Sequence, residues 1–174
     1  MSELREALRP YDGRAISMLS EIRANFNQSD DFLSELIDLV GVNDDFISDG
    51  ATWLIKDCVI SGSEPTEQDI TALVQRLDSV STWPAILHLC QLAQHIPFTS
   101  EQARQFGTWA SGFVSHERPF VRAWSMDALQ YAARLSIDLS AAAESSLAAA
   151  QVDGAASVRA RAKKHLSPDK FSAS

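Results

Sequence analysis

The chain has 174 residues and a formal net charge of −8, and hydrophobic residues make up 45% of it. This length and balance fit one globular domain with a buried core, and no run approaches the roughly 20 apolar residues of a membrane-spanning helix. Two cysteines favour a reducing, cytoplasmic location over a disulfide framework. The acidic balance argues against a general nucleic-acid binder, because the phosphates of nucleic acid repel a negatively charged protein surface.

Apolar residues recur at spacings of three and four through almost the whole chain, which is typical of amphipathic helices. We find no alternating pattern of the kind that predicts a strand. In chain order the pattern predicts ten helices, at residues 3–9, 13–26, 30–40, 44–60, 66–78, 83–96, 100–115, 118–134, 138–151 and 155–166. Short linkers between them favour antiparallel neighbours, so the sequence predicts an all-α protein.

The chain shows no break that would separate domains. It contains neither a long linker nor a low-complexity tract, and its alanine-rich part near residue 145 keeps the helical pattern. We therefore predict a single domain over residues 1–166, followed by a frayed C-terminal tail at residues 167–174.

The predicted helices repeat in pairs. The second helices of successive pairs begin near Asp44, Trp83, Arg118 and Ala155. This spacing corresponds to a period of about 37 residues, which is typical of helical-repeat proteins. Because an isolated helix pair cannot bury its apolar face, such pairs are expected to stack on one another.

One of these second helices carries a family resemblance. Residues 118–129, with the sequence RPFVRAWSMDAL, resemble the second helix of a HEAT repeat, and residues 156–166 repeat the pattern. Residues 45–55 are a weaker copy of this pattern. The helix that begins near residue 83 departs further, because Pro84 stands at about the position that Val121 holds in residues 118–129. The resemblance implies a right-handed α–α superhelix of about five HEAT-like helix pairs, with the second helices lining its concave face.

No arrangement of residues indicates a cofactor or a metal site. The sequence has no glycine-rich phosphate loop and no G-x-S-x-G nucleophile motif. His88, Cys90 and His95 share one predicted helix, but Cys90 lies on its apolar face, so the three cannot converge on one ion. We expect no cofactor and no metal, and we expect Cys58 and Cys90 to be buried.

Stacked second helices would display rows of polar residues beside their apolar faces. These rows predict a mixed groove for partner binding, formed by Lys56, His88, Gln91, His95, Arg122, Met126, Gln130, Arg159 and Lys163. We interpret the protein as a non-enzymatic scaffold that binds an acidic or amphipathic protein or peptide, and expect neither nucleic acid nor a membrane as a partner. A HEAT-like module that handles a small chromophore or a client protein stays open as a further alternative.

The charge distribution supports a partner at the C-terminal end. Residues 1–80 carry 6 basic and 16 acidic residues, whereas residues 81–174 carry 9 basic and 7 acidic ones. Arg122 and Arg159 occupy matching positions in successive repeats, where they would attract an anionic partner. In the competing account, both arginines bind acidic residues or carbonyl groups of the neighbouring repeat.

An enzyme remains the alternative interpretation. Tryptophans and an acidic residue in a helical solenoid are similar to the DNA-alkylation-repair glycosylases, which act on damaged bases. The sequence supplies Trp53, Trp83, Trp109 and Trp124 as aromatic walls, with Asp49 or Asp127 as the acid. A continuous positive surface around such a pocket would favour the enzyme, and a mixed or acidic one would favour the scaffold.

Overall fold

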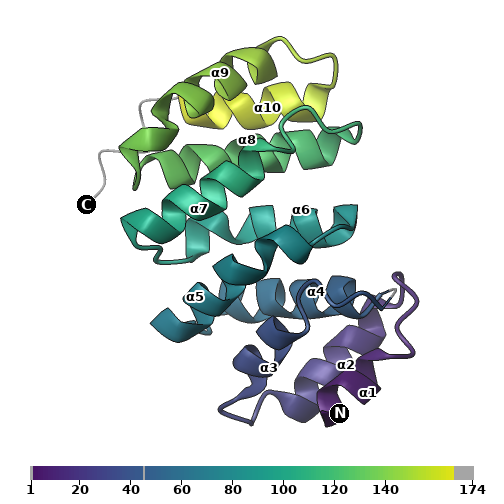
Figure 1. The fold of residues 1–174 in the computed structure, drawn as a ribbon. Coiled ribbons are helices and arrows are strands. Elements are labelled where there is room, and N and C mark those ends of the chain that lie inside the picture. The colour runs from purple at the N-terminus through teal and green to yellow at the C-terminus, as the bar shows by residue number, and fades with distance from the viewer. Residues whose placement is uncertain (1, 45, 167–174) are drawn as a thin grey trace. The chain divides into compact units, whose positions relative to one another are not determined.

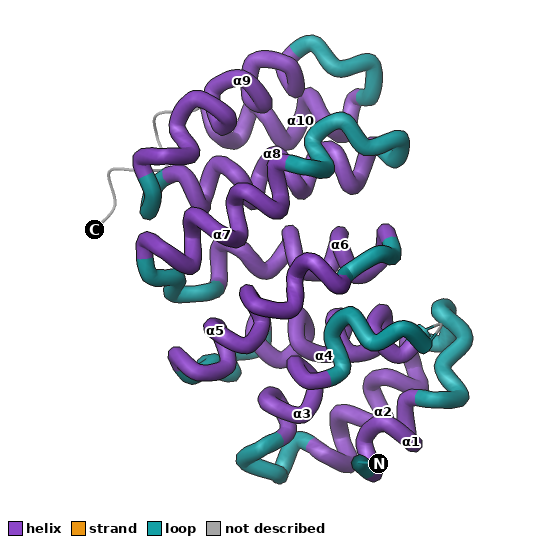
Figure 2. Tube along the Cα trace, in the orientation of Figure 1, coloured by secondary structure: helices purple, strands orange, loops and turns teal. Residues whose placement is uncertain are grey.

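The computed structural model describes residues 2–44 and 46–166. Within these ranges it contains ten α-helices, three short 3-10 helices and no strand, which confirms the all-α prediction (Figures 1 and 2). The chain divides into two compact units, residues 1–97 and 98–174, and each is described by itself. The single domain over residues 1–166 stays a prediction, and the predicted tail at residues 167–174 lies outside the described residues.

The helices lie close to their predicted ranges. In the first unit they are α1 (Glu3–Leu8), α2 (Ile16–Phe26), α3 (Phe32–Asp38), α4 (Ile47–Ile60), α5 (Glu67–Arg76), η1 (Leu77–Ser79), α6 (Trp83–Leu92) and η2 (Ala93–His95). In the second they are α7 (Ser100–Ser111), α8 (Pro119–Ala133), η3 (Ile137–Leu139), α9 (Ser140–Gln151) and α10 (Ala156–Leu166). The largest differences from prediction lie at the ends of α6 and α7.

Local signals explain where several helices begin and end. Thr66 and Thr99 each form a capping box, in which the hydroxyl accepts from the amide three residues later and that residue's side chain accepts from the threonine amide. Pro84 and Pro119 occupy first turns, where no amide hydrogen is needed. Gly41 has φ +75°, a conformation that suits glycine just after a helix.

In the first unit, α4 is the central helix. It packs against α1, α2, α3 and α6, and most of its residues are buried. α3 also contacts α5. Figure 1 shows α4 and α6 as neighbouring helices, and hydrogen bonds join their polar side chains.

In the second unit, α8 holds the corresponding central position. It packs against α7, α9 and α10, and α7 also contacts α9. Val121 and Ala128 lie in this core, as the apolar pattern predicts, and Ala128 is fully buried. Gly107 of α7 permits a close approach, because a Cβ atom there would lie 2.3 Å from Cδ1 of Leu139 and 2.9 Å from Cβ of Ala132.

Candidate functional site

The first unit has a pocket where α4 and α6 begin. We call it the amino-end pocket. It has a volume of about 680 Å³ and is lined by Asp12, Gly13, Arg14, Phe46, Asp49, Ser81, Thr82, Trp83 and Pro84. Two of its aromatic side chains are exposed, Phe46 to 42% and Trp83 to 41%. Exposed aromatic groups beside a pocket are a common feature of surfaces that bind other proteins.

Asp49 links the two helices beneath this pocket. Its carboxylate accepts hydrogen bonds from the Thr82 hydroxyl and from the backbone N–H of Ala85. Thr82 makes no side-chain cap to its own helix, so a residue of α4 caps α6 instead. Burial is the main cause that raises the pKa of Asp49 above its usual value, and both hydrogen bonds act in the opposite direction.

The 12–14 loop forms another wall. Oδ1 of Asp12 accepts from the backbone N–H groups of Arg14 and Ala15, each at 2.9 Å. These bonds lower the pKa of Asp12, which keeps its exposed carboxylate ionised at neutral pH. Gly13 has φ +79°, and a Cβ atom there would lie 2.8 Å from the Phe46 ring. Glycine is therefore needed for both the turn and the aromatic contact.

Further along α4 and α6, polar side chains pair across the two helices. The Thr52 hydroxyl lies 3.0 Å from Nδ1 of His88, and the same hydroxyl donates to the carbonyl of Asp49. We therefore assign the proton of the neutral imidazole to Nδ1, which donates to Thr52. Burial, followed by the positive charge of Lys56, lowers the pKa of His88 to about 3. His88 is thus neutral at physiological pH.

Lys56 and Gln91 form the next pair along these helices. Nζ of Lys56 donates to Oε1 of Gln91 at 3.0 Å, and burial lowers the pKa of Lys56 below its usual value. The structure therefore brings three of the predicted groove residues, Lys56, His88 and Gln91, together on neighbouring helices. Their polar groups are used in contacts between helices.

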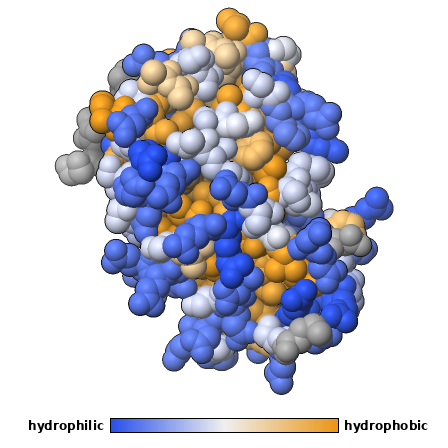
Figure 3. All heavy atoms as spheres, in the orientation of Figure 1, coloured by the Kyte–Doolittle hydropathy of each residue, from blue (hydrophilic) through white to orange (hydrophobic). Residues whose placement is uncertain are grey.

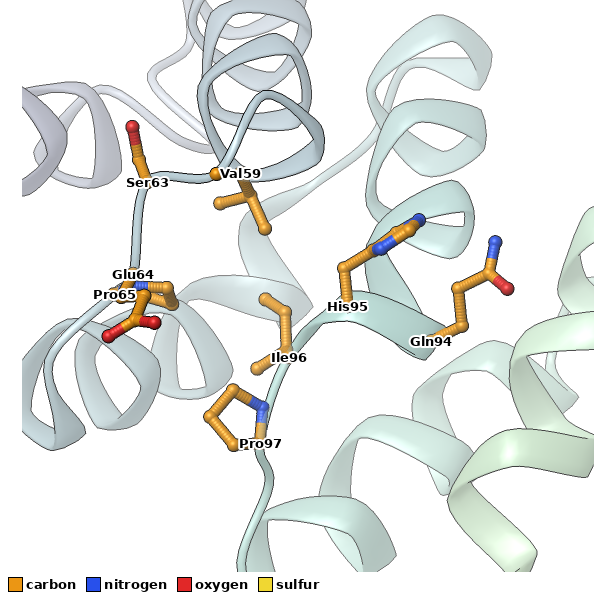
Figure 4. Close-up of a pocket in the computed structure, with 9 residues that line it drawn as sticks. Val59, Ser63, Glu64, Pro65, Gln94, His95, Ile96 and Pro97 are labelled. Carbon is orange, nitrogen blue, oxygen red and sulfur yellow. The ribbon is translucent and has the colours of Figure 1, made fainter. Parts of the chain in front are cut away.

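His95 lies in a different pocket, between the segments that follow α4 and α6. This pocket has a volume of about 570 Å³, and the side chains of Val59 and Ile96 point toward each other across it (Figure 4). Ser63, Glu64 and His95 also line it, but their polar groups point in different directions. The arrangement lacks the convergence that a nucleophile and its base need.

The two predicted arginines of the second unit are held within the chain. Arg122 makes two hydrogen bonds of 2.9 Å with the Asp153 carboxylate and donates to the carbonyl groups of His116 and Glu117. Nη1 of Arg159 donates to the carbonyl of Asp153 at 2.6 Å. Both contacts fit the structural account of these arginines, in which they join α8 and α10 to the loop between α9 and α10.

The remaining predicted groove residues of the second unit, Met126, Gln130 and Lys163, have different surroundings. Met126 is only 1% exposed and packs with Ala150 and Val158, so the predicted exposed row is wrong at Met126. Alanines and valines make up most of this cluster, so the longer Met126 side chain packs into the α8–α10 core between them. Gln130 donates to the carbonyl of Ala143 at 2.8 Å, whereas Lys163 is exposed.

The alternative acid, Asp127, is also engaged. It is buried, with its Oδ1 2.8 Å from Nε2 of His165 and 3.8 Å from Nη1 of Arg161. The guanidinium of Arg161 lies 3.7 Å from the centre of the Trp124 ring. Asp127 and Trp124 therefore stabilise the contact between α8 and α10.

Sequence reasoning missed part of the amino-end pocket. The sequence named Asp49 and Trp83 only for the enzyme alternative, and it did not indicate Asp12, Arg14 or Phe46 as site residues. The only available signals are the Asp12-Gly13 turn and an aromatic residue directly before a helix. Exposed hydrophobic residues are visible on the face shown in Figure 3, but a sequence does not reveal which of them border a pocket.

The cysteines, the potential metal ligands and the helix lengths can each be compared with the expectations from the sequence. Cys58 and Cys90 are both buried, as predicted. Among residues 2–44 and 46–166, no three potential metal ligands gather in one place. In that same part of the chain, no helix combines the length and the apolar character that crossing a bilayer requires. The cytoplasmic location stays a prediction.

In comparisons with protein-family models, curated proteins and solved structures, no match to this chain is found.

Proposed function

We propose that this chain is a HEAT-like repeat protein that binds a protein or peptide partner without catalysing a reaction. In this proposal the ten α-helices of residues 2–44 and 46–166 form about five pairs that follow a right-handed superhelix. Contacts between α3 and α5, between α4 and α6, and between α8 and α10 support it, because stacked repeats place like helices side by side.

The amino-end pocket is the observation that carries the binding function. Phe46 and Trp83 expose large rings at its edge, and such rings supply much of the binding free energy where partners bury them. Asp49, the most deeply buried acid of the pocket, already accepts from Thr82 and Ala85. The pocket thus combines exposed aromatic area with a hydrogen-bonded contact between α4 and α6 beneath it, which suits the binding of a protein or peptide partner.

The glycosylase alternative draws on the same pocket, since Trp83 and Asp49 both line it. Its electrostatics favour the scaffold. Residues 1–97 carry 6 basic and 16 acidic residues, and Arg14 is the basic residue among those that line the pocket. An acidic surface opposes the approach of DNA phosphates, which leaves the non-enzymatic proposal as the better supported one.

The acidic or amphipathic partner expected at the C-terminal end is a separate proposal. It requires Arg122 and Arg159 to exchange their contacts with Asp153 for contacts with a partner. Lys163, the third cation of this predicted row, is exposed. The stability measurements in the Discussion distinguish the two roles of these arginines.

Site-specific photo-crosslinking tests the proposed function. A benzophenone amino acid replaces the exposed pocket residue Ser81 in one protein and the exposed Glu67 of α5, which lies outside the pocket, in another. We expect one discrete protein to crosslink in cells at Ser81, and to be lost when Trp83→Leu is added. Equal crosslinking at both positions, or crosslinking that ignores Trp83→Leu, contradicts the proposal. DNA as the crosslinked species would instead favour the glycosylase.

A further inference from the structure

We propose that the amino-end pocket binds the guanidinium group of an arginine side chain presented by a basic segment of the partner. This inference rests on the proposed function and specifies the chemistry of that binding site. Three features of the first unit carry it: the exposed rings of Phe46 and Trp83, the ionised carboxylate of Asp12, and the negative field of the whole unit.

The rings provide the surface that a planar cation prefers. Phe46 and Trp83 are each about two-fifths exposed and line the same pocket. A guanidinium group stacks on an aromatic face through both its positive charge and its flat shape. The same pairing occurs inside the second unit, where Arg161 lies 3.7 Å from the ring centre of Trp124.

Asp12 supplies the opposite charge at the pocket wall. Its Oδ1 is held by two backbone N–H groups, which orients the carboxylate without neutralising it. A carboxylate fixed in this way is ready to accept from the N–H groups of arginine, which are arranged for planar, two-point contact. Gly13, the next residue, lies close to the Phe46 ring, because a Cβ atom there would be 2.8 Å from it, so the acid and the ring lie in the same part of the pocket.

The charge of the first unit favours a cation over an anion. Residues 1–97 carry 16 acidic against 6 basic residues, and such an excess draws a basic segment toward the surface before contact. Helix amino ends and Arg14 are the features that would attract an anion. At α6, however, the Ala85 amide and the Thr82 hydroxyl already donate to Asp49. These two donors are therefore not available to bind an anion at the amino end of α6.

A labelled peptide tests this chemistry directly. The probe is a fluorescein-labelled peptide of alternating glycine and arginine, and its binding to the full chain is followed by anisotropy. One matched peptide has citrulline, the neutral isostere, in place of arginine. We expect the arginine peptide to bind, the citrulline peptide to bind at least about tenfold more weakly, and salt to weaken the complex.

Variants of the pocket locate the interaction. We expect Trp83→Leu, Phe46→Leu and Asp12→Asn each to weaken binding about three- to thirtyfold. Asparagine retains the Oδ1 acceptor for the turn, so Asp12→Asn removes the charge and the second acceptor oxygen while keeping the turn bonds. Glu21→Gln is the matched control, because Glu21 is exposed on α2 and outside the pocket. Circular dichroism checks that each variant keeps its helices.

Each other outcome overturns the inference in a recognisable way. If Glu21→Gln weakens binding as much as Asp12→Asn, the peptide senses only the net charge. If both peptides bind equally and both are lost in Trp83→Leu, the pocket binds peptides but does not select a cation, so the proposed function survives. Failure of the arginine peptide to bind, or its displacement by inorganic phosphate at constant ionic strength, also overturns the inference.

Discussion

The Arg122 guanidinium and the Asp153 carboxylate form a two-point ion pair across 31 residues of sequence, with Nε to Oδ2 and Nη2 to Oδ1 both at 2.9 Å. The pair is largely shielded from water, since the two side chains are 20% and 16% exposed. It raises the pKa of Arg122 and lowers the pKa of Asp153. Its place between α8 and the loop before α10 indicates a role in joining these helices.

The first prediction follows from this pair. Arg122→Ala should lower the free energy of unfolding by about 1.5 to 3 kcal/mol, because it leaves a poorly solvated carboxylate without its main partner. Arg159→Ala, which removes one hydrogen bond, should lower it by about 1 kcal/mol. Urea unfolding measures both, with Lys164→Ala of the exposed α10 surface as the control. Unchanged stability in both arginine variants would instead favour their role in partner binding.

The second prediction concerns the pH dependence contributed by Asp49. Its pKa is higher in the folded chain than its usual value, so the folded state holds the proton more tightly than the unfolded state. This contribution to stability is present at low pH and is lost as the pH rises from the ordinary pKa through the folded one. Asp49→Asn should therefore gain stability relative to wild type as the pH rises through that window.

Asp49→Ala is the comparison that completes this test. Alanine accepts no hydrogen bond, so the Thr82 hydroxyl and the Ala85 amide lose the partner that caps α6. We expect this variant to be less stable than Asp49→Asn at every pH, by about 1 to 2 kcal/mol. Equal stability of the two variants would show that the cap from α4 contributes nothing.

The third prediction concerns His88. Because its pKa is about 3 in the folded chain and about 6.5 when unfolded, the unfolded state binds more protons between these values. Stability from this residue is complete above the unfolded pKa and falls as the pH drops toward the folded one, by at most about 1.4 kcal/mol per pH unit. His88→Gln should remove this slope in urea unfolding between pH 7 and 4. His95→Gln, at an exposed position, is the control.

The fourth prediction reverses the usual effect of a helical glycine. Gly→Ala within an exposed helix commonly stabilises by up to about 1 kcal/mol. At Gly107, however, the new methyl group would overlap Leu139 and Ala132, so we expect a loss of about 1 to 3 kcal/mol. Gly154→Ala, in the loop between α9 and α10, is a control for the added methyl group, since nothing lies within 4 Å of its Cβ position. A stabilised Gly107→Ala would mean that α7 and η3 separate easily.

The sequence alone determined the all-α class, the approximate bounds of the helices and the burial of Cys58 and Cys90. These properties depend on local spacing, because a helix turns every 3.6 residues and its caps use side chains only a few positions away. Thr66 and Asp69, for example, form their capping box across three residues. The burial of Val121 and Ala128 follows from the same periodicity.

Only the tertiary structure decided what the polar side chains contact. Periodicity places Arg122 and Met126 on a helix, but Asp153 and Val158, which meet them, lie about 30 residues further along. In the same way, the cap of α6 by Asp49 and the aromatic rim of the amino-end pocket depend on how α4, α6 and the 12–14 loop pack. A side chain's partner is set by the helix packed against it, and local spacing does not identify that helix.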